Sequence, residues 1–262
     1  MSWMCTVGLC DELEFQLSDR IELSCDDPSI PNDERNLVVK AAQRLRPNPS
    51  AGASINLKKR IPAGGGLGGG SSDAVAALVA LNKLWDLNWP LEKLAPIAAT
   101  LGSDVSFFLY PPSAICSGVG EIVTPIAPPA VRWAVLILPA FGMETVKVYQ
   151  QFDRMKLGRG EAIALAPDWT NWARLTAAEL LPHLINDLEK PAFDLSTELA
   201  RLRDDCQAQL SRPVCLSGSG STLFTLFDRE LDAHAAAQSL HGLSAKIQAL
   251  RLAPDVRLSF ES

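Results

Sequence analysis

Residues 59–73 read Lys-Arg-Ile-Pro-Ala-Gly-Gly-Gly-Leu-Gly-Gly-Gly-Ser-Ser-Asp, and six of the eight residues Ala63–Gly70 are glycines. Glycine lets the main chain approach a neighbouring group closely and adopt positive φ angles that other residues resist. The alternating residues 54–58 before this stretch predict a strand, and the apolar spacing over 74–85 predicts a helix. Ser71, Ser72 and Asp73 are residue types typical of helix starts, so we expect the serines to cap this helix.

A strand, a glycine bend and a capped helix in this order predict a phosphate-binding site. The free N–H groups and partial positive charge of a helix start attract anions, phosphates above all. Either serine hydroxyl, Ser71 or Ser72, is then expected near an Mg²⁺ ion bridging the phosphates. A flexible hinge or a tight packing corner is the alternative interpretation of such a glycine tract.

Two familiar phosphate-binding patterns fit this tract poorly. The P-loop pattern GxxxxGK[ST] fails, because Ser71 stands where the lysine belongs. GxGxxG is present at Gly64, Gly66 and Gly69, but a tract this rich in glycine satisfies it trivially. A dinucleotide site also needs a second strand that ends in an acid about 20 residues on, whereas this region continues as helix. The hypothesis that the chain is an NAD-dependent oxidoreductase therefore rests on this degenerate motif alone.

The rest of the chain predicts two α+β halves. Alternating residues predict strands over 11–17 and 20–25, with a tight turn at Ser18-Asp19, and helical spacing over 37–45 follows Asn32 and Asp33 as cap candidates. Pro125, Pro128 and Pro129 mark the boundary, so we expect domains at 1–128 and 129–262. The second half holds four further strand-like runs, 133–138, 213–216, 222–227 and 244–250.

The composition of the chain limits the cellular locations and the classes of binding partner that we expect for it. Hydrophobic residues make up 47% and charged residues 21% of the 262 residues, and the net charge is −6, which argues against a broad nucleic-acid surface. No apolar run reaches the roughly 18 residues of a membrane span, and the start lacks the basic stretch of a signal peptide. The six cysteines form no CxxC pair and the three histidines show no metal-ligand spacing, which favours reduced thiols, a cytoplasmic location and no structural zinc.

Residues 62–72 resemble the ATP-binding motif of the GHMP kinases, which phosphorylate small alcohols such as galactose, homoserine and mevalonate. Lys59-Arg60 before the motif and Asn82 in the helix after it are similar to the branch that acts on 4-diphosphocytidyl-2-C-methyl-D-erythritol. Five further segments match that branch in order, at 101–105, 118–121, 145–149, 186–189 and 216–221. The resemblance implies a two-domain α+β architecture with the active site in the cleft between domains.

The resemblance also implies a reaction and its site. ATP would phosphorylate the 2-hydroxyl of the cytidine-diphosphate-linked methylerythritol, a step of the non-mevalonate isoprenoid pathway, with Mg²⁺ as cofactor. Asp104 matches the catalytic aspartate, which would orient or deprotonate that hydroxyl. Tyr149 matches an aromatic residue that stacks on the cytosine, and the third-motif loop comprises Ser217, Gly218, Ser219 and Gly220. The implied ATP-binding residues are Lys59, Pro62, Gly64, Gly65, Gly66, Leu67, Gly68, Gly69, Gly70, Ser71 and Ser72.

Each of these residues has a plainer alternative. Asp104 would cap a helix, Lys59 would be a strand-end lysine in water, and the third-motif loop would be a flexible linker. Tyr149 would be a half-buried core residue. Residues 186–189 would simply stabilise the second half, and we assign them no chemistry.

One part of the family pattern has no counterpart in this sequence. Members of the family begin with a Pro-x-Lys-x-Asn-Leu strand that carries a catalytic lysine, followed by a Gly-Tyr-His segment that recognises cytidine, and residues 1–13 resemble what comes after these. We interpret this as a mis-set start, or as a short variant with weak or no kinase activity. Removing one electrostatic donor from such a site costs on the order of 10²–10³ in rate. A nucleotide-binding, catalytically impaired variant and a sister GHMP kinase for another small alcohol therefore remain alternatives.

Overall fold

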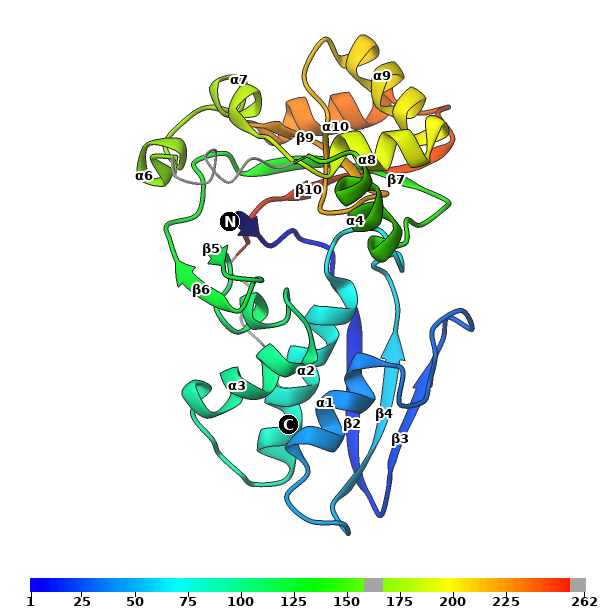
Figure 1. Cartoon of the computed structure of the whole chain (residues 1–262), viewed down its shortest axis with the longest axis vertical. Helices are drawn as coiled ribbons and strands as arrows, with labels where there is room; N and C mark the ends of the chain where they lie inside the picture. Colours follow the sequence, from blue (N-terminus) through cyan, green and yellow to red (C-terminus); the bar gives the residue numbers. More distant parts are fainter. Residues whose placement is uncertain (158–166, 255–262) are drawn as a thin grey trace.

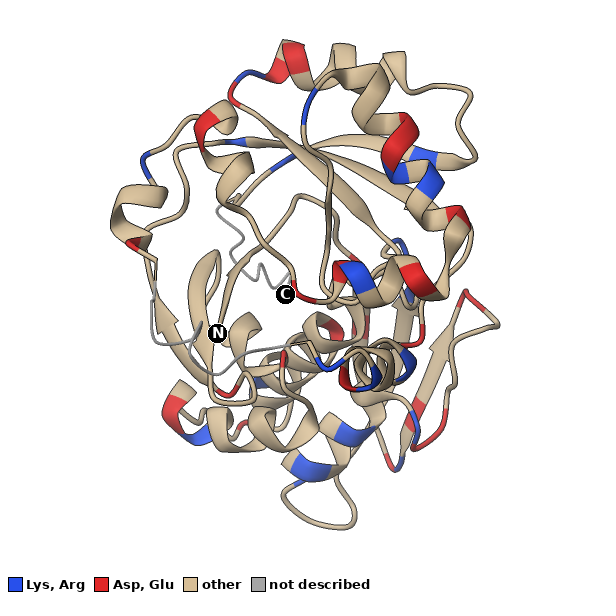
Figure 2. Cartoon of the chain, turned by 45° about the horizontal axis from the view of Figure 1, so that its top comes forward, with Lys and Arg blue, Asp and Glu red and all other residues tan. Residues whose placement is uncertain are grey.

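The computed structural model describes residues 1–157 and 167–254, so residues 158–166 and 255–262 of the predicted second domain lie outside the described part. The fold has a lower and an upper half, each a sheet with helices packed on it (Figure 1). Acidic and basic residues are interspersed along the outer helices of both halves (Figure 2). No helix of the described residues is long and apolar enough to cross a membrane.

The lower half is built on a sheet in the order β2-β4-β3, from β2 (Glu12–Ser18), β4 (Gly52–Lys58) and β3 (Ile21–Cys25). β2 runs antiparallel to β4, and β3 runs parallel to it. The turn at Ser18-Asp19 therefore does not close a hairpin, because β4 lies between the two opening strands. Gly52 makes this possible, since a Cβ on it would lie 2.3 Å from the amide nitrogen of Arg20.

α1 (Leu37–Leu45) and α2 (Gly69–Leu84) cover one face of this sheet, and α3 (Leu91–Leu101) packs on these two helices (Figure 1). Their apolar faces share one core with the buried side of β4, including Ile55, Leu57 and Leu78. The cap of α1 was wrongly predicted at Asn32 or Asp33. Asn36 is the cap, because its side-chain oxygen accepts a hydrogen bond of 2.8 Å from the amide of Val38.

A small middle sheet has the order β1-β5-β6, from β1 (Ser2–Cys5), β5 (Ser113–Ser117) and β6 (Ile122–Pro125). The 3₁₀ helix η1 (Ser106–Leu109) precedes β5. Side chains from β1 pack into the core of the upper half, and Val7 pairs with Leu252 near the carboxyl end. The first residues therefore connect the two halves.

The upper half has a sheet in the order β10-β7-β9-β8, from β7 (Trp133–Pro139), β8 (Cys215–Leu216), β9 (Leu223–Phe227) and β10 (Ala245–Arg251). Alternate residues of β7 enter two different cores, so this sheet is buried on both faces. The helical segments around it are α4 (Thr145–Arg154), α6 (Trp169–Trp172), α7 (Ala177–Leu180), η2 (Leu181–His183), α8 (Glu189–Leu195), α9 (Thr197–Leu210) and α10 (Glu230–Ser239). The division at residues 128 and 129 stays our proposal.

Candidate active site

The glycine bend connects the end of β4 to the start of α2. Gly64, Gly66 and Gly68 have φ angles of 65°, 70° and 67°, which only glycine adopts without strain. Within residues 1–157 and 167–254, no group accepts a hydrogen bond from the main-chain amides of residues 66–71. A run of unpaired amides at a helix start is the arrangement that binds anions.

The serines after the bend do not cap the helix, contrary to the prediction. Gly68 is the cap residue, because a left-handed glycine lets α2 begin at Gly69, and no side chain caps this end. Ser71 and Ser72 therefore lie inside the first turn, where the Ser72 hydroxyl donates a hydrogen bond of 2.9 Å to the carbonyl of Gly69. A hydroxyl oxygen keeps lone pairs for a cation while its proton is donated elsewhere. The prediction that one of these serines lies near Mg²⁺ therefore stays open.

The third-motif loop lies directly against the glycine bend. The Ser217 hydroxyl donates to the Gly66 carbonyl at 2.8 Å, and the amide of Thr222 donates to the Gly65 carbonyl at 3.1 Å. A Cβ on Gly66 would lie 2.2 Å from the carbonyl oxygen of Ser217. The loop is therefore no free linker, and the predicted adjacency of the two glycine turns is confirmed. Its part in nucleotide binding stays a prediction.

The segment 186–189, for which the sequence predicted no chemical role, binds this loop through two side chains. The Asn186 amide group donates to the carbonyls of Leu216 and Gly218, at 3.0 and 2.7 Å. The Glu189 carboxylate accepts from the amide of Leu216 at 2.8 Å. The order of the segments that resemble the family pointed to this stretch, but its hydrogen-bond partners lie about 30 residues away and follow only from the fold.

Asp104 lies in the turn between α3 and η1. Val105 is the cap residue of η1 and no side chain caps that helix, so the helix-cap alternative for Asp104 is wrong. Partial burial raises the pKa of its carboxyl. The neighbouring Phe108 ring lies 2.9 Å from where a Cβ on Gly68 would stand, which places this turn beside the glycine bend.

Tyr149 projects from α4 in the upper half and is 53% exposed, so it is not a core residue. Partial burial raises the pKa of its hydroxyl, and the negative charge of Asp104 raises it further. The Asp104 carboxylate is therefore close enough to the Tyr149 hydroxyl to act on it electrostatically. Whether Tyr149 stacks on a base stays a prediction.

Lys59 is not a strand-end lysine in water, because its side chain is only 7% exposed. Its ammonium forms ion pairs with Asp11 and, at 2.9 Å, with Asp73 on the first turns of α2. Burial lowers the pKa of Lys59, but the two carboxylates raise it more, so the net shift is upward. Burial raises the pKa of Asp73 to about 7, since the lowering effect of Lys59 offsets it only in part and the neighbouring Asp11 carboxylate raises it further. The predicted ATP contact of Lys59 stays open, since its ammonium lies beneath Gly69.

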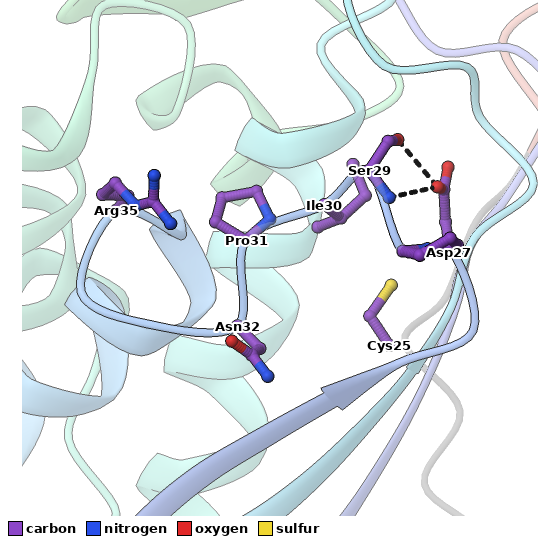
Figure 3. Close-up of a pocket in the computed structure, with 8 residues that line it drawn as sticks. Cys25, Asp27, Ser29, Ile30, Pro31, Asn32 and Arg35 are labelled. Atoms are coloured by element: carbon purple, nitrogen blue, oxygen red, sulfur yellow. Dashed lines mark hydrogen bonds between the residues drawn. The ribbon is translucent and has the colours of Figure 1, made fainter.

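A pocket of about 360 Å³ opens on the loop between β3 and α1, and Figure 3 shows Cys25, Ser29 and Arg35 around it. The loop borders the glycine bend: the Lys59 amide donates to Asp26 at 2.8 Å, and Leu37 lies 3.8 Å from where a Cβ on Gly70 would stand. No group of three or more histidine, cysteine or acidic residues in the described part of the chain forms a metal site.

Comparison with known protein families shows which family the chain with this site belongs to. The profile of the GHMP kinases N terminal domain matches residues 36–111, and that of the GHMP kinases C terminal domain matches residues 162–243. The chain belongs to the GHMP kinases. The two profiles contain, respectively, the glycine bend with Asp104 and the third-motif loop.

Relatives of this GHMP kinase match it over nearly its whole length. The 4-diphosphocytidyl-2-C-methyl-D-erythritol kinase of Shouchella clausii (strain KSM-K16) is 35% identical over 253 residues, which cover 95% of this chain and 84% of the relative. The enzyme of the same name from Bacillus cereus (strain B4264) is 36% identical over 255 residues, covering 95% and 86%.

Solved structures of GHMP kinases also share the fold. A crystal structure of 4-(cytidine 5'-diphospho)-2C-methyl-D-erythritol kinase has a TM-score of 0.73 and 33% identity, covering 95% of this chain and 88% of that one. The homoserine kinase of Cytophaga hutchinsonii has a TM-score of 0.70 at 20% identity over 92% and 85%, and shows the fold alone. The resemblance, the fold class and the kinase assignment drawn from the sequence are confirmed.

Proposed function

We propose that this kinase transfers the γ-phosphoryl group of ATP to the 2-hydroxyl of 4-diphosphocytidyl-2-C-methyl-D-erythritol. The observation that carries the proposal is the identity of 35% over 95% of the chain with a relative of that name. The site supports it, because unpaired amides of residues 66–71 and the carboxylate of Asp104 lie on adjoining elements. A phosphoryl acceptor and donor need these two kinds of group close together.

The amides of residues 66–71 would bind the β- and γ-phosphate oxygens of ATP. Their partial positive charge at the start of α2 would stabilise the charge that develops on the transferred group. The loop that forms the pocket at 25–35 is hydrogen-bonded through Asp26 to the Lys59 amide, just before the bend, and the pocket has a volume of about 360 Å³, so we propose it for the nucleotide base. Ser71 and Ser72 offer hydroxyl oxygens to Mg²⁺, which commonly keeps several waters and binds substrate phosphates. When bound, Mg²⁺ neutralises phosphate charge.

Asp104 would orient the substrate hydroxyl and accept its proton as the oxygen attacks the γ-phosphorus. The bond from that phosphorus to the β–γ bridging oxygen breaks, and ADP leaves with that oxygen. Partial burial raises the pKa of Asp104, which makes the carboxylate a better base than an ordinary aspartate. Tyr149, exposed on the facing helix, would stack on the cytosine of the substrate.

The free cysteines support a cellular location, and the net charge supports a class of binding partner. All six cysteines are free, which suits the reducing cytoplasm, and we propose that location. The net charge of −6 supports a small-molecule substrate rather than a nucleic-acid or membrane partner.

The test is ADP release with Mg-ATP and the cytidine-bearing alcohol as acceptor, with mevalonate and homoserine assayed in parallel. Turnover confined to the first acceptor supports the proposal, and turnover on mevalonate or homoserine alone assigns a sister kinase. Calorimetry with ATP tests the remaining possibility, that the chain binds the nucleotide but transfers no phosphoryl group. ATP binding without phosphoryl transfer to any acceptor would identify the chain as the catalytically impaired variant that the sequence keeps as an alternative.

A further inference from the structure

Asn186 and Glu189 bind one peptide segment from both sides. The Leu216 amide donates to Glu189 at 2.8 Å, and the Leu216 carbonyl accepts from Asn186 at 3.0 Å. Asn186 also reaches the Gly218 carbonyl at 2.7 Å. Its own side-chain oxygen accepts from the Leu188 amide at 2.9 Å, so the NH₂ group must face the loop. These two side chains, the clamp residues, thus hold the start of the third-motif loop.

The third-motif loop and the two residues after it donate hydrogen bonds to three consecutive carbonyls of the glycine bend, and these bonds hold the bend in place. The Gly64 carbonyl accepts from the Ser221 amide at 3.3 Å, and the Gly65 carbonyl accepts from the Thr222 amide at 3.1 Å. The Gly66 carbonyl accepts from the Ser217 hydroxyl at 2.8 Å. Every hydrogen bond from the loop to the bend therefore uses a carbonyl of the bend.

Because the peptide group is planar, the hydrogen bonds to these carbonyls also fix the direction of the amides that follow them in the glycine bend. In a planar trans peptide the C=O of one residue and the N–H of the next point in opposite directions. Since the carbonyls of Gly65 and Gly66 face the third-motif loop, the amides of Gly66 and Leu67 face away from it. Both amides belong to the unpaired run 66–71. Both amides therefore remain free to donate to another acceptor, such as a phosphate oxygen.

We infer that Asn186 and Glu189 are positioning residues for the nucleotide: they hold the third-motif loop so that the carbonyls of the glycine bend stay bound and its amides stay free. Neither side chain contacts the bend itself. The inference rests on the proposed function, because it names residues of the carboxyl-terminal half that set ATP affinity in the amino-terminal half. It predicts a loss confined to ATP, with the acceptor site intact.

Asn186→Asp tests this inference with little change in volume. A carboxylate cannot donate to the carbonyls of Leu216 and Gly218, and its charge repels both. Losing two hydrogen bonds of typical net strength should weaken ATP binding by about 10-fold to 100-fold. Glu189→Gln keeps an acceptor for the Leu216 amide and should bind ATP within about twofold of the parent chain. Asn171→Asp, the same change at an exposed position on α6, is the matched control.

The measurements are calorimetric ATP affinity, KM for ATP and for the acceptor, and the midpoint of thermal unfolding. A higher KM for ATP with an unchanged KM for the acceptor supports the inference. Unchanged ATP affinity in Asn186→Asp overturns it, and equal losses for both substrates assign Asn186 a merely structural role. If Asn186→Asp fails to fold, Ser217→Ala removes only the bond to Gly66, and unchanged ATP affinity there overturns the inference. A parent chain that binds no ATP refutes the proposed function itself.

Discussion

The negative charge of Asp104 adds to partial burial in raising the pKa of the Tyr149 hydroxyl, although the two residues belong to opposite halves of the chain. Asp104 follows α3 in the lower half, and Tyr149 lies on α4 in the upper half. The relationship places a carboxylate of the lower half within electrostatic reach of a hydroxyl of the upper half.

Asp104→Asn should abolish most turnover while leaving ATP binding intact. The amide cannot accept the proton of the attacking hydroxyl, so kcat should fall by about 10²-fold to 10⁴-fold. The residue caps no helix, so the unfolding midpoint should stay close to that of the parent. ADP release and ATP calorimetry check this prediction. Joint loss of ATP binding and stability would mean that Asp104 is structural.

Tyr149→Ala should raise KM for the cytidine-bearing acceptor and leave KM for ATP unchanged. Stacking of one base on an aromatic ring contributes about 1–3 kcal/mol, which corresponds to roughly 5-fold to 150-fold in affinity. Tyr149→Phe keeps the ring and should stay within about twofold of the parent. Steady-state kinetics with both substrates distinguish the variants. Equal effects of the two substitutions would contradict a stacking role and favour one for the hydroxyl.

Gly66→Ala should disrupt the contact between the two glycine turns. The new Cβ would stand 2.2 Å from the Ser217 carbonyl oxygen, and φ of 70° strains any side chain. We expect ATP affinity to fall by at least about 10-fold, the effect of misplaced amides worth about 1.4 kcal/mol. Gly8→Ala is the control, since its nearest contact would be an ordinary 3.6 Å. Calorimetry that finds parent-like ATP affinity in Gly66→Ala would refute the role of the bend.

Lys59→Met should destabilise the protein rather than selectively weaken ATP binding. The substitution leaves the carboxylates of Asp11 and Asp73 buried without their ammonium partner. Breaking a buried pair in this way costs about 3–5 kcal/mol. Urea unfolding measures the loss. A variant of parental stability with weak ATP binding would instead support the direct ATP contact that the sequence suggests.

Asp73 should make stability depend on pH in a defined direction. Burial, only partly offset by Lys59, raises its pKa to about 7 from an unfolded value of about 3.9. Between these two values the folded state binds more protons than the unfolded state, so the free energy of unfolding falls as pH rises from about 4 to about 7. Asp73→Asn removes this titration. The parent should therefore lose stability relative to the variant across that window, by a few kcal/mol in urea unfolding.

A pH-independent difference between the parent and Asp73→Asn would show that Asp73 keeps its ordinary pKa in the folded state. The same experiment with Glu121→Gln, a change in the turn at 117–121 far from Lys59 in sequence, controls for the loss of one negative charge.

The sequence by itself determined the features that depend on neighbouring residues. Glycine density at 63–70, the helical spacing of 37–45 and the alternation of 54–58 act over a few residues, and each produced the expected element. The ordered motifs also identified the family. Local signals of this kind do not depend on which distant segments the chain later brings together.

Only the tertiary structure decided the features that depend on long-range contacts. It inserted β4 between the opening strands, started α2 at Gly69 and buried Lys59 between two carboxylates. It also brought the loop at 217 against the bend at 66, with Asn186 behind it. Backbone carbonyls, amides and charges choose these partners by proximity once the chain is folded, and no residue pattern within one segment records that choice.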